Sequence, residues 1–152
     1  MKKITIITPT YNRAKTLPKV FESLLKQSFK DFIWIILDDG STDNTTEVVE
    51  NFQLFNPFFE IIYKKDKNRH KFLTVLEGVK MVKTPYFMVV DSDDIYPEDA
   101  LETLISEVEK IENQDNYVAV MGLSADENGK IVGNQYPNNG FDGSIFEMRY
   151  KH

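Results

Sequence analysis

Short runs of β-branched and aromatic residues alternate with segments of helical periodicity along most of the chain. The runs are too short to be typical helices, and we predict that they form buried strands over residues 3–8, 32–37, 58–63 and 86–90. Repeated alternation of strand and helix is typical of a mostly parallel sheet with helices on both faces. This alternation therefore places the chain in the α/β class.

Each predicted strand is followed by a segment that carries apolar residues at helical spacing. Proline, acidic and hydroxyl residues stand where helices favour them, close to the first turn. These signals predict helices that begin after Thr16, after Thr42 or Asn44, at Lys71 and near Pro97. The last helix has the clearest apolar stripe, formed by Leu101, Leu104, Ile105, Val108 and Ile111.

The C-terminal part of the chain has a different pattern. A fifth strand is predicted at residues 117–121. Asn128 and Gly129 form a strong hairpin turn signal between residues 123–125 and 130–132. The predicted fold is therefore a mostly parallel α/β sheet flanked by helices, with a C-terminal β-hairpin.

The composition excludes several classes of function. Because the chain has no cysteine, it has no disulfides, no thiolate catalysis and no cysteine-based zinc site. A formal net charge of −6 argues against a nucleic-acid partner. The first apolar run is broken at Pro9, which makes it too short for a signal peptide or a membrane span.

Three polar motifs, at residues 8–12, 38–41 and 91–94, lie directly after predicted strands. In open α/β sheets, ligands bind beyond the carboxyl ends of the strands. Because parallel strands end at the same edge of a sheet, we expect the three motifs to lie close together. They are the candidates for one binding site.

The motif Asp91-Ser92-Asp93-Asp94 suits a metal–diphosphate site. Alternate residues leaving a strand can aim two carboxylates at one point, and Mg2+ and Mn2+ prefer oxygen ligands completed by substrate phosphates. A metal ion held by Asp91 and Asp93 would stabilise the charge on a leaving diphosphate. The alternative is an acidic turn that serves the helix starting near Pro97, a role that suits Asp94 because acids are favoured at helix N-termini.

The remaining motifs each allow a binding role and a purely structural role. Asp38 or Asp39 could accept a hydrogen bond from a uracil imide or a ribose hydroxyl, although both also suit a tight turn. Tyr11 could stack on a base or pack on the rim of the domain. The basic stretch at residues 68–71 could contact a base oxygen or a phosphate through Lys71, or form a solvated loop.

Together these motifs resemble those of the inverting family 2 glycosyltransferases, which have the Rossmann-like GT-A fold. Residues 4–13 look like the opening strand and loop of that family, and residues 23–32 are similar to its first helix and the following turn. Residues 38–45 match its second signature, and residues 91–94 match its D-x-D metal motif. The resemblance covers residues 3–110. It implies a metal-dependent enzyme that uses Mn2+ or Mg2+ to transfer a sugar from a nucleotide-diphospho sugar, a UDP-sugar in most members, to an acceptor hydroxyl with inversion.

The resemblance also implies roles for residues after the first two strands. Pro9 and Tyr11 would line the nucleotide pocket, together with Thr8. Asp39 would bind the base, usually uracil in this family, with Asp38 in support. The first two motifs are thus expected to form the nucleotide-binding half of the site.

The acidic motif would complete the site. Asp93 would be the direct metal ligand, Asp91 would reach the ribose or the water shell of the metal, and Ser92 is assigned to the nucleotide site. Lys71 would lie near the base. The chain departs from the family pattern at residues 69–75, where relatives often have a Gly-rich loop and an asparagine in the next helix. This departure leaves the base and sugar contacts of that region open.

Family members carry an Asp or Glu general base well beyond the D-x-D motif, where it deprotonates the acceptor hydroxyl. Among the acids after Asp94, Asp142 and Glu147 are the candidates for this base, and neither matches a catalytic motif. We therefore expect residues 1–152 to be a single GT-A nucleotide-sugar-binding domain of a longer bacterial enzyme, cut off before its base. The acceptor would be a glycan or a lipid-linked molecule. We expect a cytoplasmic location, at the inner face of the membrane in the full-length enzyme.

Two other functions would use similar residues. A non-catalytic nucleotide- or cation-binding module would bind through the same acidic edge without transferring a sugar. A nucleotidyltransferase would also use carboxylates and Mg2+, but such enzymes usually carry a Gly-rich phosphate loop near the first strand. Glycine is absent from residues 1–39, which favours the glycosyltransferase interpretation.

Overall fold

The computed structural model describes residues 2–114, 119–126 and 128–132. The chain forms two compact units, Met1–Ile105 and Ser106–His152. Among the helices of the described residues, none is both long enough and apolar enough to cross a membrane.

The first unit contains a four-stranded sheet in the order β3-β2-β1-β4. Its strands are β1 (Ile4–Thr10), β2 (Phe32–Asp38), β3 (Glu60–Lys65) and β4 (Tyr86–Val89). All three strand pairs are parallel. The predicted α/β class and the mostly parallel sheet are therefore confirmed.

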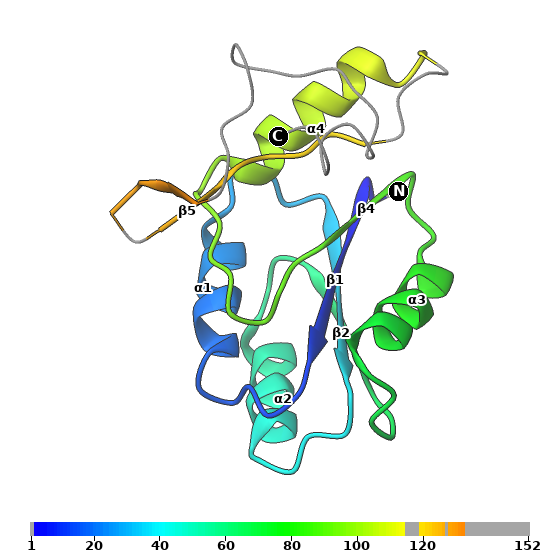
Figure 1. Ribbon diagram of the computed structural model, residues 1–152, viewed down its shortest axis with the longest axis vertical. Helices are drawn as coiled ribbons and strands as arrows, with labels where there is room; N and C mark the ends of the chain where they lie inside the picture. The colour runs from blue at the N-terminus through cyan, green and yellow to red at the C-terminus, as the bar shows by residue number, and fades with distance from the viewer. Residues whose placement is uncertain (1, 115–118, 127, 133–152) are drawn as a thin grey trace. The chain divides into compact units, whose positions relative to one another are not determined.

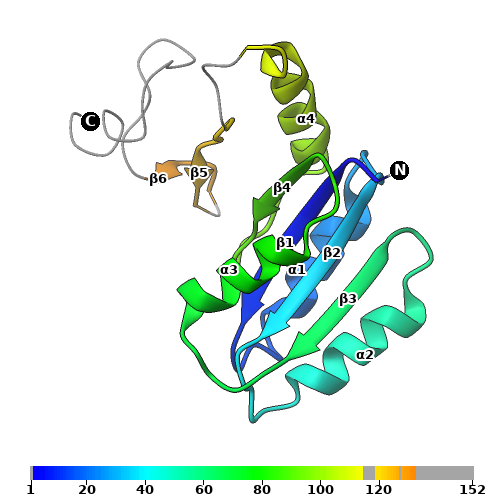
Figure 2. The same cartoon turned by 90° about the vertical axis from the view of Figure 1, so that its right-hand side faces the viewer.

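Helices cover both faces of this sheet. They are α1 (Leu17–Lys26), α2 (Thr45–Phe55) and α3 (Lys71–Met81), and a fourth helix, α4 (Ala100–Ile111), begins in the first unit and ends in the second. Figures 1 and 2 show α1 and α2 on one face of the sheet and α3 on the other. Thr16 and Asn44 stand at the N-cap positions of α1 and α2, but neither side chain makes a capping hydrogen bond.

Alternating side chains of β1 and β2 divide the core into two clusters. Ile6 and Trp34 belong to the larger one, with α1 and α2, whereas Ile7 and Ile35 belong to a smaller one beside α3. Trp34 is completely buried, and its indole Nε1 donates a 2.9 Å hydrogen bond to Oγ1 of Thr8. Strands β1 and β2 are covered on both faces, which explains why their sequences are mostly apolar without a regular alternation.

Strand β1 continues through Pro9, although proline was expected to end it at residue 8. The carbonyl of Ile7 accepts a hydrogen bond from the amide of Val90, just past the end of β4. The backbone of Pro9, two residues after Ile7, faces the same side of β1. At this position β4 has already ended. Its missing N–H therefore costs no ladder bond, which is the situation in which a sheet tolerates proline.

Helix α3 approaches the sheet closely at Gly78. A Cβ atom at this position would lie 2.7 Å from Cγ2 of Ile7 and 2.7 Å from Cδ1 of Leu37. Both neighbours belong to buried strands, so a larger residue would push the helix away from the sheet.

We expect Gly78→Ala to lower the free energy of unfolding by about 1–2 kcal/mol, because overpacking outweighs the better helix propensity of alanine. Urea unfolding would measure the change. Gly122→Ala is a suitable control, since a Cβ at Gly122 meets no atom within 4 Å. Equal stability of the Gly78→Ala variant and the wild type would show that α3 can shift without cost.

The second unit contains a short antiparallel pair, β5 (Ser124–Ala125) and β6 (Ile131–Val132). The predicted C-terminal hairpin is confirmed. The fifth strand predicted at 117–121 is not: residues 119–121 form no strand, and residues 117–118 lie outside the described part of the chain. An apolar run becomes a strand only where a partner pairs with it, and periodicity alone does not supply one.

Candidate functional site

A pocket of about 370 Å3 lies at the carboxyl edge of the sheet, within the size range of small-molecule sites. It is lined by residues from all of the predicted motifs: Pro9, Thr10, Tyr11, Arg13, Asp39, Asn68, His70, Lys71, Asp91, Ser92 and Asp93. The structure thus brings together every site residue predicted from the sequence except Thr8 and Asp38. Those two are buried behind the pocket wall.

The loop after β1 is fastened to the loop after β2 by Asn12. Its backbone N–H donates to Oγ of Ser41 at 2.8 Å, and its side-chain Oδ1 accepts a 2.8 Å hydrogen bond from the amide of Thr42. Asn12 has a φ of 53°, a conformation that asparagine tolerates better than most residues. With the loop fixed in this way, Tyr11 remains 46% exposed in the pocket wall and is available to stack on a ligand.

Asp38 and Asp39 have different surroundings. Asp38 is buried, and its carboxylate accepts hydrogen bonds from the amide of Ser41 at 2.7 Å and from the hydroxyl of Tyr63 at 2.6 Å. Asp39 lines the pocket. Gly40 turns the chain between them and Ser41 with a φ of +88°, and a Cβ there would lie 3.1 Å from the amide nitrogen of Asn68. Asp38 therefore braces the turn, while Asp39 faces the pocket.

Burial raises the pKa of the Tyr63 phenol, and its hydrogen bond to Asp38 raises the pKa further. A raised pKa means that folding favours the protonated phenol. The resulting stabilisation is complete below the ordinary tyrosine pKa of about 10 and is lost as the pH rises through the folded-state value.

We expect Tyr63→Phe to destabilise the protein by about 1–2 kcal/mol at pH 8, since Asp38 loses a hydrogen-bond donor. The difference from the wild type should shrink when the pH is raised to about 11, where the unfolded wild type gains from ionising its phenol. Urea unfolding of both proteins at the two pH values tests this. A difference that grows with pH would contradict the assignment.

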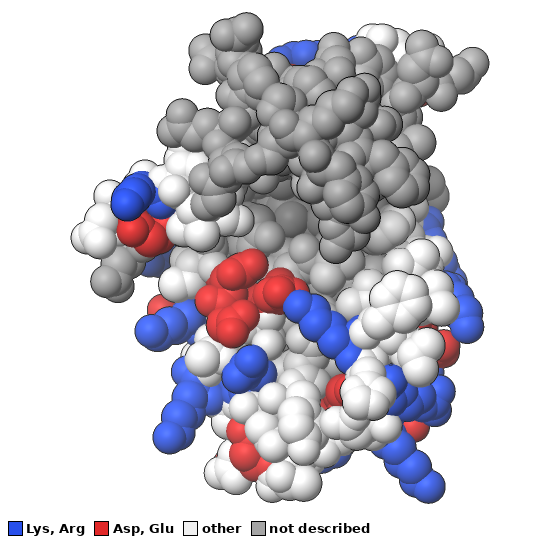
Figure 3. Space-filling model, viewed as in Figure 1, with Lys and Arg blue, Asp and Glu red and all other residues white. Residues whose placement is uncertain are grey.

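The acidic motif after β4 is paired with two cations. Lys71 Nζ lies 2.7 Å from Oδ2 of Asp91, and a guanidinium nitrogen of Arg13 lies 3.7 Å from Oδ2 of Asp93. Arg13 also donates from Nε to Oγ of Ser92 at 3.3 Å. Figure 3 shows a group of acidic side chains at the surface with Lys and Arg side chains beside it. The two cations pair with Asp91 and Asp93, and both carboxylates remain partly exposed.

These acids suit a cation that takes few protein ligands. Asp91 and Asp93 are partly exposed and both open to the pocket. Burial raises the pKa of the neighbouring Asp94 carboxyl, and the charges of Asp91 and Asp93 raise it further, so the motif has a negative potential that a cation would relieve. Within the described residues there is no group of three or more His, Cys, Asp or Glu side chains that could hold a metal alone. The donor set therefore fits an ion whose shell is completed by phosphate oxygens.

The alternative role for Asp94, at the start of the next helix, is wrong. Helix α4 begins at Ala100 and not near Pro97, which leaves Asp94 outside its first turn. The amide of Leu101 is instead satisfied by Oε1 of Gln27 from α1, at 3.0 Å. A side chain distant in sequence thus takes the place of a local capping acid.

Several contacts in the site were not predicted individually. Arg13 lies within the family-like segment at residues 4–13, but its pairing with Asp93 was not predicted, and neither was the contact of Thr74 with Asp39. The hydroxyl Oγ1 of Thr10 is buried in the pocket wall without a hydrogen-bond partner among the described residues. An unpartnered buried hydroxyl at such a position is a group that a ligand could satisfy. Asp142 and Glu147, the acids considered for a general base, lie outside the described residues.

The parallel sheet and the pocket at its carboxyl edge define an α/β domain whose pocket lies where open α/β sheets generally bind ligands. The family model described as Glycosyl transferase family 2 matches residues 5–151. The chain belongs to this family.

Curated relatives with similar sequences are bacterial glycosyltransferases. Glycosyltransferase GlyG of Streptococcus pneumoniae serotype 4 is 33% identical over 107 residues, which cover 70% of this chain and 35% of the relative. Poly(ribitol-phosphate) beta-N-acetylglucosaminyltransferase TarP of Staphylococcus aureus is 35% identical over 108 residues, covering 68% of this chain and 32% of the relative. The chain thus spans about a third of the length of these relatives.

Solved glycosyltransferase structures share the fold. S. aureus TarS 1-349 in complex with UDP-GlcNAc has a TM-score of 0.64 and 26% sequence identity, covering 72% of this chain and 32% of that chain. Mannosyltransferase PcManGT from Pyrobaculum calidifontis has a TM-score of 0.66 and 20% identity, covering 70% of this chain and 32% of that chain. The GT-A fold expected from the sequence is therefore confirmed.

Proposed function

We propose that the chain is the donor-binding domain of an inverting, metal-dependent glycosyltransferase that transfers a sugar from a UDP-sugar to an acceptor hydroxyl. The observation that carries this proposal is the meeting of Tyr11, Asp39, Asp91 and Asp93 in one pocket. Family membership supports the reaction class. The UDP-GlcNAc complex of TarS supports the uridine donor, because that structure is 26% identical to this chain.

In this proposal the nucleotide lies across the carboxyl ends of β1 and β2. Tyr11 stacks on the base, and Asp39 accepts a hydrogen bond from the uracil imide. Pro9 shapes the same wall. Thr8 and Asp38 act from behind it, since Thr8 accepts the Trp34 indole N–H and Asp38 holds the turn.

The diphosphate lies over the acidic motif, where Asp93 would hold Mn2+ or Mg2+. When bound, the cation stabilises the negative charge of the leaving diphosphate. Asp91 would reach the ribose or a water of the metal shell, and Ser92 beside it would contact the nucleotide. Lys71 and Arg13, which pair with the two acids, would contact phosphate oxygens of the nucleotide.

We also propose that residues 1–152 belong to one nucleotide-sugar-binding domain, and that the acceptor is a glycan or a lipid-linked molecule at the cytoplasmic side of a bacterial membrane. The absence of cysteine suits a reducing compartment. The relative TarP, a poly(ribitol-phosphate) beta-N-acetylglucosaminyltransferase, supports a polymeric acceptor in polysaccharide biosynthesis.

Calorimetric titration of UDP into this chain, with and without Mn2+, tests the donor site. We expect UDP to bind more tightly in Mn2+ than in its absence, and more tightly than GDP in the same buffer. Magnesium should replace manganese with the same order of nucleotide affinities. Absence of binding by any nucleoside diphosphate, with either metal, would overturn the proposal.

A further inference from the structure

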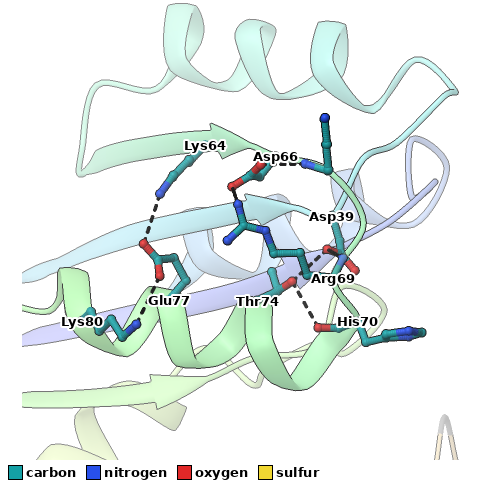
Figure 4. A network of polar contacts seen from close by, with 9 residues as sticks. Asp39, Lys64, Asp66, Arg69, His70, Thr74, Glu77 and Lys80 are labelled. Atoms are coloured by element: carbon teal, nitrogen blue, oxygen red, sulfur yellow. Dashed lines mark hydrogen bonds and ion pairs between the residues drawn. The ribbon is translucent and has the colours of Figure 1, made fainter.

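The carboxylate of Asp39 receives its hydrogen bonds unequally. The backbone N–H of Arg69 donates to Oδ1 at 2.7 Å, and the hydroxyl of Thr74 donates to the same oxygen at 3.0 Å (Figure 4). No other described residue donates to this carboxylate. Oδ1 is therefore occupied by the protein, and Oδ2 is the oxygen left for a ligand.

Asp39 also lines two cavities. One is the large pocket, and the other is a small one of about 30 Å3 that Arg69 and Thr74 also line. Thr74 does not line the large pocket. Among the described residues that its hydroxyl contacts, Asp39 and His70 line this pocket, so Thr74 acts on a bound nucleotide indirectly, through them.

The Thr74 hydroxyl has a choice of two acceptors for its single hydrogen. Besides Oδ1 of Asp39, the carbonyl of His70 lies 3.3 Å away, one helical turn earlier. The carboxylate is closer and charged, and hydrogen bonds to charged acceptors are the stronger ones. The hydrogen is thus directed to Asp39, where it fixes the orientation of the carboxylate.

A carboxylate with one available oxygen discriminates between bases. Uracil offers a single imide N–H flanked by two carbonyl groups, which one acceptor oxygen satisfies. Guanine offers two neighbouring N–H donors on one edge, which match a carboxylate with both oxygens available. With Oδ1 already accepting two bonds, the second guanine donor would be left without a partner, and an unsatisfied buried donor is costly.

We propose that Thr74 is a specificity-determining positioning residue, which together with the Arg69 amide reserves one oxygen of Asp39 for the base and so favours uracil over guanine. The inference rests on the proposed nucleotide site. It also gives a role to the segment after Asn68, where the chain departs from the usual pattern of its family.

The test compares the affinities of UDP and GDP, both in Mn2+, for the wild type, Thr74→Val and Thr74→Ser. Valine keeps the β-branched shape and removes the hydroxyl, whereas serine keeps the hydroxyl. We expect the UDP-over-GDP preference to fall about tenfold in Thr74→Val, the size of one hydrogen bond to a charged group. Thr74→Ser should keep the preference within about twofold, because its hydroxyl can still reach Oδ1.

A ratio of affinities separates this role from a general loss of structure, which would weaken both nucleotides together. Thermal unfolding of each variant checks the fold, and Thr74→Ala serves as a second hydroxyl-free variant if valine fits poorly. If the wild type prefers UDP and the hydroxyl-free variants keep the same preference, the role of Thr74 is wrong. The proposed donor site would still stand. A wild type that binds neither nucleotide would overturn the donor site and this inference together.

Discussion

Replacing Asp93 with asparagine is expected to weaken UDP binding in Mn2+ about 100-fold. Even groups that only support a metal ligand typically contribute 10–100-fold to metal affinity, so a direct ligand should contribute at least as much. The Asp93 side chain is 53% exposed, and asparagine has nearly the same shape. The loss should therefore come from the missing charge, with the fold intact.

Without the metal, the same variant should bind UDP at least as well as the wild type. Asp93 places a negative charge beside the proposed diphosphate position, and its removal relieves repulsion and releases Arg13 from its ion pair. The effect of one substitution thus changes sign with the metal, which a general structural defect would not produce.

Calorimetric titration of UDP with and without Mn2+ measures both parts of this prediction. Asp99→Asn is the matched control, because Asp99 is an exposed aspartate outside the pocket. It should leave the Mn2+ effect unchanged. If Asp93→Asn keeps the full Mn2+ effect, the metal is held elsewhere in the protein.

The sequence predicted most of the sheet because the strands of this fold are apolar on both faces. Residues 32–37 all fall within β2, which extends one residue further to Asp38, whereas the strand predicted at 58–63 lies at Glu60–Lys65. Strand β3 is at the edge of the sheet and partly exposed, so hydrophobicity marks its ends poorly. The end of β1 was predicted wrongly at Pro9 for a related reason. A proline is tolerated there because the neighbouring strand β4 ends before it, and the local sequence does not show this.

The site was predictable in its residue types and less so in its contacts. Asp39 and Asp93 follow strands, so topology alone brings them to one edge of the sheet. The pairing of Arg13 with Asp93 joins residues from different loops, and the bond from Thr74 to Asp39 joins a helix to a strand end. Such pairings depend on the conformations of segments that are distant in the sequence, and no local sequence pattern predicts them.

The neighbouring aspartates after β2 should give opposite results when they are replaced. Asp38→Ala is expected to lower the free energy of unfolding by about 3 kcal/mol, because the amide of Ser41 and the hydroxyl of Tyr63 both lose a charged acceptor. Asp38→Asn should cost less, about 1 kcal/mol, since its amide oxygen can still accept from Ser41. Urea unfolding at neutral pH measures all three proteins.

Asp39→Ala should instead remove UDP binding and change stability less. Its partner Thr74 keeps the His70 carbonyl as an alternative acceptor, so only the Arg69 amide loses its bond. By contrast Asp38 is 2% exposed and has no route to a ligand except through the turn that it holds. If Asp38→Ala were as stable as the wild type but unable to bind UDP, Asp38 would contact the nucleotide directly, and the division of roles between the two carboxylates would be wrong.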